Sequence, residues 1–222
     1  MMTKLTVSDY FSSADLERIR EAVTAAERDT SAEIVPFIVE RSDDYEEAFW
    51  RAGMLVGSLA LALFGFLSAG TGLWLPFNLI EVVLIVLLTV ATAMLIVRSV
   101  PSLRRMLAGK ELIEQRVTQR AKEAFLAEQI FATRQRTGIL FFISLLEHRV
   151  LVLGDSGIST VFGDSGWAGV VERVVAGVRS GSPVDGVVDA IQLMALLLEE
   201  RGFVKRPDDR NELPDRPRDG EK

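Results

Sequence analysis

The sequence contains no cysteine, and its 222 residues include a single histidine. The lack of cysteine excludes disulfides, thiol nucleophiles and thiolate-bound zinc. The lone histidine, His148, excludes a histidine-rich metal centre built from one chain. Positive charge is also in the minority, because 31 Asp and Glu residues outnumber 25 Lys and Arg residues and the formal net charge is -6. Outside the basic residues that follow the second of two long apolar runs, described below, the sequence has no basic stripe. We therefore expect no nucleic-acid partner.

Charged residues are nearly missing from two stretches near the middle of the chain, residues 49–69 and 77–97. Each run has about the 20 residues that a helix needs to cross a bilayer. Residues 70–76, which separate the runs, contain Gly, Trp and Pro and predict a short turn. A buried helix of a soluble bundle would keep a polar face, which residues 84–97 lack apart from two threonines. The two runs therefore predict a transmembrane helical hairpin within residues 49–100, with the lipid bilayer as a partner.

Basic residues follow the second apolar run closely, whereas the turn between the runs has no Lys or Arg. Such a bias places the basic side of a hairpin in the cytoplasm, where these residues also attract anionic lipids. The first ten residues lack the apolar core of a signal peptide, so no cleaved signal is expected. We expect an inner-membrane protein with two spans, its soluble domain and both termini being cytoplasmic. The flanking basic residues are Arg98, Arg104, Arg105 and Lys110.

Small residues recur along the first apolar run at Gly53, Gly57 and Ala60. This spacing resembles the small-residue ridges that let helices approach closely in lipid. The ridge has two interpretations. It seats the second helix of the same hairpin, or it forms a contact between chains in an oligomer.

The rest of the chain has the pattern of a soluble α/β domain. Ser12 predicts a helix N-cap with Asp15 three residues later, and residues 138–144 form an apolar run typical of a central strand. The predicted elements are a helix, a strand, the membrane hairpin, a long helix, two strands and two helices, over residues 11–30, 32–40, 49–100, 101–135, 138–144, 149–154, 167–179 and 183–201.

This order predicts an α/β fold, an αβα sandwich with a small mixed sheet that the membrane hairpin interrupts. Residues 1–48 would supply the first part of the domain and residues 101–202 the second part. Residues 203–222 are charged and rich in proline, and they predict a flexible tail.

Several stretches, in this order and spacing, resemble the TPM-domain family, in particular its membrane-embedded bacterial members. The resemblance implies an αβα sandwich and a role in the assembly, maturation or repair of membrane complexes. Relatives in that family include a thylakoid-lumen protein reported as an acid phosphatase and an accessory protein of a neurotransmitter-gated channel, and some members bind calcium or magnesium. The matching stretches are residues 11–16, 30–35, 136–142, 150–154 and 207–214.

The loop after residue 154 is where the resemblance would place a Ca²⁺ or Mg²⁺ site. Asp155 and Asp164 are the candidate ligands, because hard cations prefer carboxylate oxygens. Ser159 stands where the family pattern has a glutamate, which removes one expected ligand. The alternative is structural, with the glycines and aspartates of this loop forming turns and helix caps. The repeated Gly-Asp-Ser-Gly letters at 154–157 and 163–166 do not indicate a serine protease, since no partner histidine is suitably placed.

These observations favour a non-enzymatic module. We expect a membrane-anchored, chaperone-like interaction or assembly module that acts on membrane protein complexes, within a homo-oligomer or a hetero-oligomer with a related membrane protein. The alternative is a membrane-tethered, divalent-metal-dependent phosphatase that uses Asp155 and Asp164.

Overall fold

The computed structural model describes residues 7–70, 78–163, 166–206 and 212–220. The chain forms two compact units. One consists of Asp43–Gln115, and the other combines the chain before residue 43 with the chain from Arg116 onward. The segments on either side of the hairpin thus fold into one unit, although more than seventy residues separate them in the sequence.

The first unit contains two long helices, α3 (Glu46–Gly70) and α4 (Leu79–Ser99), and the short helix α5 (Pro101–Ala108). Both long helices are long and apolar enough to cross a membrane. Helix α4 begins where Asn78 and Glu81 form a capping box, in which each side chain accepts a hydrogen bond of 3.0 Å from the other's backbone amide. After α4, Pro101 is the first residue of α5, a position that proline favours.

The second unit contains a four-stranded mixed sheet in the order β3-β2-β1-β4. Strands β1 (Glu33–Val39) and β2 (Gly138–Ser144) pair in parallel, as Ile34 does with Ile139. Strand β3 (Arg149–Gly154) runs antiparallel to β2, and the two-residue β4 (Arg218–Asp219) lies parallel to β1 at the other edge. Strands β1 and β2 are buried along their whole length, and for β2 the apolar run of residues 138–144 predicts this.

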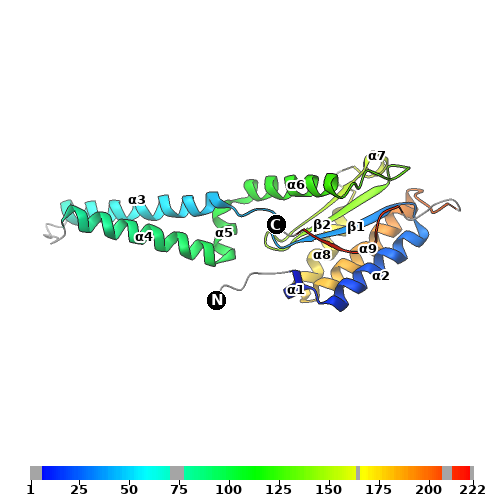
Figure 1. Ribbon diagram of the computed structural model, residues 1–222, viewed down its shortest axis with the longest axis horizontal. Coiled ribbons are helices and arrows are strands. Elements are labelled where there is room, and N and C mark those ends of the chain that lie inside the picture. The colour runs from blue at the N-terminus through cyan, green and yellow to red at the C-terminus, as the bar shows by residue number, and fades with distance from the viewer. Residues whose placement is uncertain (1–6, 71–77, 164–165, 207–211, 221–222) are drawn as a thin grey trace. The chain divides into compact units, whose positions relative to one another are not determined.

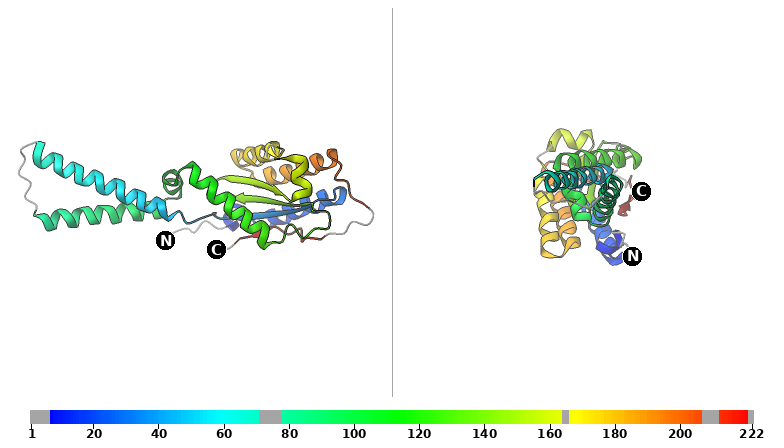
Figure 2. Two further views of the ribbon diagram at one scale, coloured as in Figure 1. Left: turned by 90° about the horizontal axis from the view of Figure 1, so that it is seen from above. Right: turned by 90° about the vertical axis from the view of Figure 1, so that its left-hand side faces the viewer.

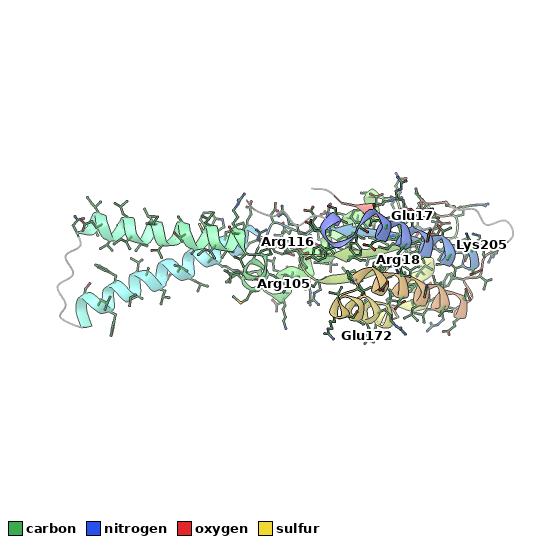
Figure 3. All side chains as sticks on the ribbon, turned by 90° about the horizontal axis from the view of Figure 1, so that it is seen from below. Glu17, Arg18, Arg105, Arg116, Glu172 and Lys205 are labelled. Atoms are coloured by element: carbon green, nitrogen blue, oxygen red, sulfur yellow. The ribbon has the colours of Figure 1, made fainter. Side chains whose placement is uncertain are left out.

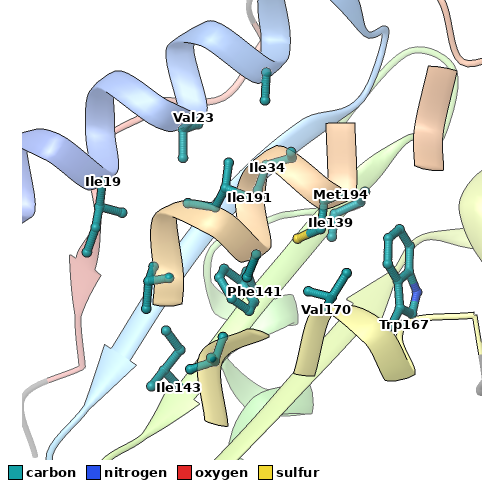
Figure 4. Packing of buried hydrophobic residues seen from close by; sticks show 14 of the residues in the cluster. Ile19, Val23, Ile34, Ile139, Phe141, Ile143, Trp167, Val170, Ile191 and Met194 are labelled. Carbon is teal, nitrogen blue, oxygen red and sulfur yellow. The ribbon is translucent and has the colours of Figure 1, made fainter. Parts of the chain in front are cut away.

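Helices cover both faces of this sheet, which confirms the predicted αβα sandwich (Figure 1). Alternate residues of β1 and β2 pack against α2, α8 and α9 in one core, which Figure 4 shows. On the opposite face, α6 lies over the strands when the molecule is seen from above (Figure 2). The helices of this unit are α1 (Val7–Tyr10), α2 (Ser13–Asp29), the greater part of α6 (Lys110–Ala127), α7 (Ser156–Phe162), α8 (Ala168–Ser180) and α9 (Pro183–Glu200).

Local signals predicted some helix boundaries and missed others. The predicted capping box of Ser12 and Asp15 is present at the start of α2. The single long helix expected over residues 101–135 is two helices, α5 and α6, which Gly109 separates with φ 84°. Helix α6 ends at Ala127, and Gln129 then adopts a left-handed backbone with φ 53°. The loop expected after β3 contains the helix α7. Its serine and glycine residues are weak helix formers, so propensity alone does not predict it.

The C-terminal residues differ most from expectation. Where we expected a flexible tail from residue 203, the described part of it lies along the α/β unit and ends in β4. The amide of Ser31 donates to the carbonyl oxygen of Phe203, and Gly220 donates to Ile38. We call residues 203–206 and 212–220 the C-terminal strap. Although the strap is rich in charged residues, it packs on the unit because its backbone forms hydrogen bonds with the edge of the sheet.

Candidate functional site

The predicted metal ligand Asp155 has a structural role. It follows β3 directly and is the N-cap of α7, where its Oδ1 accepts a 2.6 Å hydrogen bond from the amide of Ser156. Its Oδ2 lies 3.0 Å from Nε of Arg136. The other predicted ligand, Asp164, lies outside the described residues. Within the described part of the chain, no group of three or more His, Asp or Glu side chains is placed to hold a metal ion.

The neighbouring residues of this loop also stabilise α7. The hydroxyl of Ser159 donates a 2.6 Å hydrogen bond to the carbonyl oxygen of Gly154. Gly157 lies against the chain at residues 135–136, where an added Cβ would come within 2.7 Å of the carbonyl oxygen of Arg136. Ser159, which replaces the expected glutamate, therefore bonds to the backbone, and Gly157 permits a close approach between two segments.

The small-residue ridge of α3 faces α4. A Cβ added to Gly53 would lie 2.8 Å from Cε of Met94, and one added to Gly57 would lie 3.1 Å from Cγ2 of Val90. Both glycines are buried, and Ala60 is half-buried. The two glycines thus contact α4 of the same chain, as the first interpretation of the ridge expects.

The four basic residues after α4 occupy different environments. Arg104 is buried, donates a 2.5 Å hydrogen bond from Nη2 to the carbonyl oxygen of Arg98, and lies over the ring of Phe49. It therefore closes the C-terminal end of α4. The side chains of Arg98 and Lys110 are exposed, and that of Arg105 is half-buried.

A buried group of carboxyls lies beneath the strap, which the sequence did not indicate. Oε1 of Glu27 accepts a 2.8 Å hydrogen bond from the amide of Ile34. The two oxygens of Glu33 accept hydrogen bonds from the strap amides of Glu212 and Leu213, at 3.1 and 3.3 Å. Asp215 of the strap accepts a 2.8 Å hydrogen bond from the hydroxyl of Thr24. The sheet edge and the strap are thus joined through carboxyl groups.

Burial determines the protonation of these carboxyls. Burial raises the pKa of Glu27 to about 9; the amide of Ile34 opposes this shift, and the nearby charges of Glu33 and Asp215 contribute to it. Burial likewise raises the pKa of Glu33, although the amides of Glu212 and Leu213 oppose this shift. Glu27 is therefore neutral at pH 7 and makes no contribution to cation binding there.

A second buried polar network fixes the turn between β2 and β3. Oε1 of Glu147 accepts a 2.9 Å hydrogen bond from the amide of Ser42, and its Oε2 accepts one from the hydroxyl of Ser144. The hydroxyls of Ser42 and Ser144 are also 2.8 Å apart. In this turn His148 adopts a left-handed backbone with φ 52°. The network holds residues 145–148 in place, and these residues form one wall of a pocket.

That pocket has a volume of about 520 Å³ and lies among α1, the turn between β2 and β3, α8 and the start of α9. Arg149 and Arg179 also line it, and both side chains are exposed. The sequence does not show this pocket, because three segments that are far apart along the chain build it, residues 10–11, 143–150 and 174–187. Its apolar wall includes Phe11, Ile143, Val150, Val174, Val178 and Val187.

Comparison with known proteins supports the fold. The NMR structure of the BA42 protein from the psychrophilic bacterium Bizionia argentinensis is similar to this chain with a TM-score of 0.58 and 16% sequence identity. The match covers 97% of this chain and 99% of that chain. No protein-family model and no curated protein matches the sequence. At this identity the likeness is one of fold.

Proposed function

We propose that the protein is a membrane-anchored interaction module of the TPM kind, which helps membrane protein complexes to assemble. In this proposal α3 and α4 cross the inner membrane, and the α/β unit with both termini lies in the cytoplasm. The module works in a homo-oligomer or with a related membrane protein. The alternative phosphatase gains no support from the described residues, because Asp155 is engaged with Ser156 and Arg136.

The exposed apolar surface of the hairpin carries this proposal. In the most apolar 18-residue stretch of each helix, the buried share is 17% for α3 and 11% for α4. Side chains project outward along both helices (Figure 3). Exposed apolar residues on such a scale mark a membrane or a protein contact. Large examples are Leu55, Leu59, Phe66, Ile80, Leu84 and Leu88.

Native mass spectrometry of the full chain released from nanodiscs tests the proposal. The expected result is a mass above that of one 24.5 kDa chain, through further copies or another membrane protein. A single chain without partners would contradict the proposal. A phosphatase assay with and without Mg²⁺ or Ca²⁺ completes the test. Metal-dependent turnover that Asp155→Asn abolishes would favour the enzyme instead.

A further inference from the structure

The pocket between α1, α8 and the turn after β2 combines apolar walls with charged lining residues of one sign. Arg149, Arg179 and His148 line it, and none of the described residues that line it is Asp or Glu. This is unusual in a chain whose acidic residues outnumber its basic ones by 31 to 25. An apolar wall with two arginines on its lining fits a ligand that combines an apolar body with an anionic end.

The size of the pocket limits the ligand to a small molecule. Its volume of about 520 Å³ lies within the range of roughly 300 to 1,000 Å³ that is common for small-molecule sites. Valines from α8 and α9 form much of the wall, including Val174, Val178 and Val187. Such walls bind alkyl groups by removing them from water. Arginine binds carboxylates through charge-assisted hydrogen bonds, often two at once.

We propose that this pocket binds a free fatty acid, with its alkyl chain against the valines and its carboxylate at Arg149 and Arg179. A membrane is the natural source of this ligand for a protein with membrane-spanning helices. The inference goes beyond the interaction function, and neither depends on the other. A fatty acid would fill the pocket even if the protein had no partner.

Photochemical labelling of the full chain tests this proposal. The protein is placed in phosphatidylcholine nanodiscs and exposed to a palmitate that carries a diazirine on its chain. After irradiation, mass spectrometry locates the labelled peptides. The expected labels lie in residues 143–150 and 174–187, and an excess of palmitate removes them. Labels confined to α3 and α4 would show simple partition into lipid and would overturn the proposal.

Five single variants, two of which are controls outside the pocket, separate binding in the pocket from general affinity for lipid. Val178→Trp should fill the pocket and abolish the labels. Val161→Trp, on α7 and outside the pocket, should keep them. Both valines are exposed, so neither change should disturb folding much. Arg149→Gln and Arg179→Gln should each weaken competition by palmitate about tenfold. Arg173→Gln, on the same helix as Arg179 but outside the pocket, should leave it unchanged.

The role of the carboxylate is tested with hexadecanol, which keeps the alkyl chain and lacks the charge. With the native protein, hexadecanol should remove the label much less well than palmitate does. With the Arg149→Gln/Arg179→Gln double variant, hexadecanol and palmitate should remove it equally poorly. Circular dichroism checks that each variant is folded. Equal competition by palmitate and hexadecanol with the native protein, or full labelling of Val178→Trp, would contradict the proposal.

Discussion

At the scale of single residues, the buried carboxyls under the strap show how tertiary structure changes chemistry. Glu27 is 7% exposed, and its carboxyl bonds to the backbone of β1. In water a glutamate of this kind would be charged at neutral pH, but the surrounding protein raises its pKa to about 9. The strap residue Asp215 adds to this shift, so the protonation of Glu27 is linked to the packing of the strap.

Glu27→Gln should stabilise the protein at alkaline pH. The folded protein keeps the proton on Glu27 up to about pH 9, whereas the unfolded chain loses it near the usual value of 4.5. The folded state therefore binds more protons between these values, and stability falls as the pH rises through them. Glutamine retains the acceptor for Ile34 and carries no charge. Thermal unfolding should show a gain of at least about 1 kcal/mol at pH 8 and a smaller one at pH 5. An equal gain at both values would contradict the assigned ionisation.

Asp155→Ala should destabilise the α/β unit by about 1 to 2 kcal/mol, because α7 loses its N-cap and Arg136 loses its ion pair. The matched control is Asp185→Ala, which removes an exposed 2.7 Å ion pair with Arg18. Such a surface pair contributes about 0 to 1 kcal/mol. Denaturant unfolding measures both changes. If the two variants lose the same stability, Asp155 does not have the structural role described here.

At the scale of elements, α3 and α4 form a pair because small residues lie where the helices meet. Gly53 and Gly57 allow Val90 and Met94 to approach the backbone of α3. Helices α8 and α9 use the same device in the α/β unit, where a Cβ on Gly177 would lie 2.5 Å from Cα of Gly186. A ridge that looks suited to an oligomer can therefore be used within one chain.

Gly57→Leu should loosen the hairpin, since the new side chain would clash with Val90. Gly65→Leu is the control, because nothing lies within 4 Å of a Cβ built at Gly65. The measurement is the temperature of aggregation of the detergent-solubilised protein, which should fall for Gly57→Leu and stay nearly constant for Gly65→Leu. If Gly57→Leu keeps the native temperature but dissociates an oligomer that Gly65→Leu leaves intact, the ridge acts between chains.

At the scale of the whole molecule, the hairpin interrupts the α/β unit without dividing it. Strand β1 precedes the insertion and β2 follows it, yet the two pair in parallel over seven residues each. The two ends of the hairpin must therefore leave the same unit. Both flanks then lie on one side of any membrane that the hairpin crosses.

This organisation makes topology testable with single cysteines, because the native chain has none. Thr71→Cys, which lies between α3 and α4 in the sequence, should react with a membrane-impermeant maleimide added to intact cells. Ser180→Cys, an exposed position at the end of α8, should react only after the cells are opened. The reverse pattern would place the α/β unit outside the cytoplasm.

Patterns along the chain were sufficient for the membrane-length helices, the capping box of Ser12 and the layered α/β class. Each depends on hydrophobic length or on residues within one or two helical turns, which the sequence displays directly. The strap, the raised pKa of Glu27 and the pocket beside Arg149 and Arg179 depend on contacts between distant segments. Desolvation and edge pairing arise after those segments pack, so local propensity carries no signal for them. The same reason applies to Asp155, because its ion pair with Arg136 forms only after two separate segments pack. Its role as a metal ligand stays a prediction.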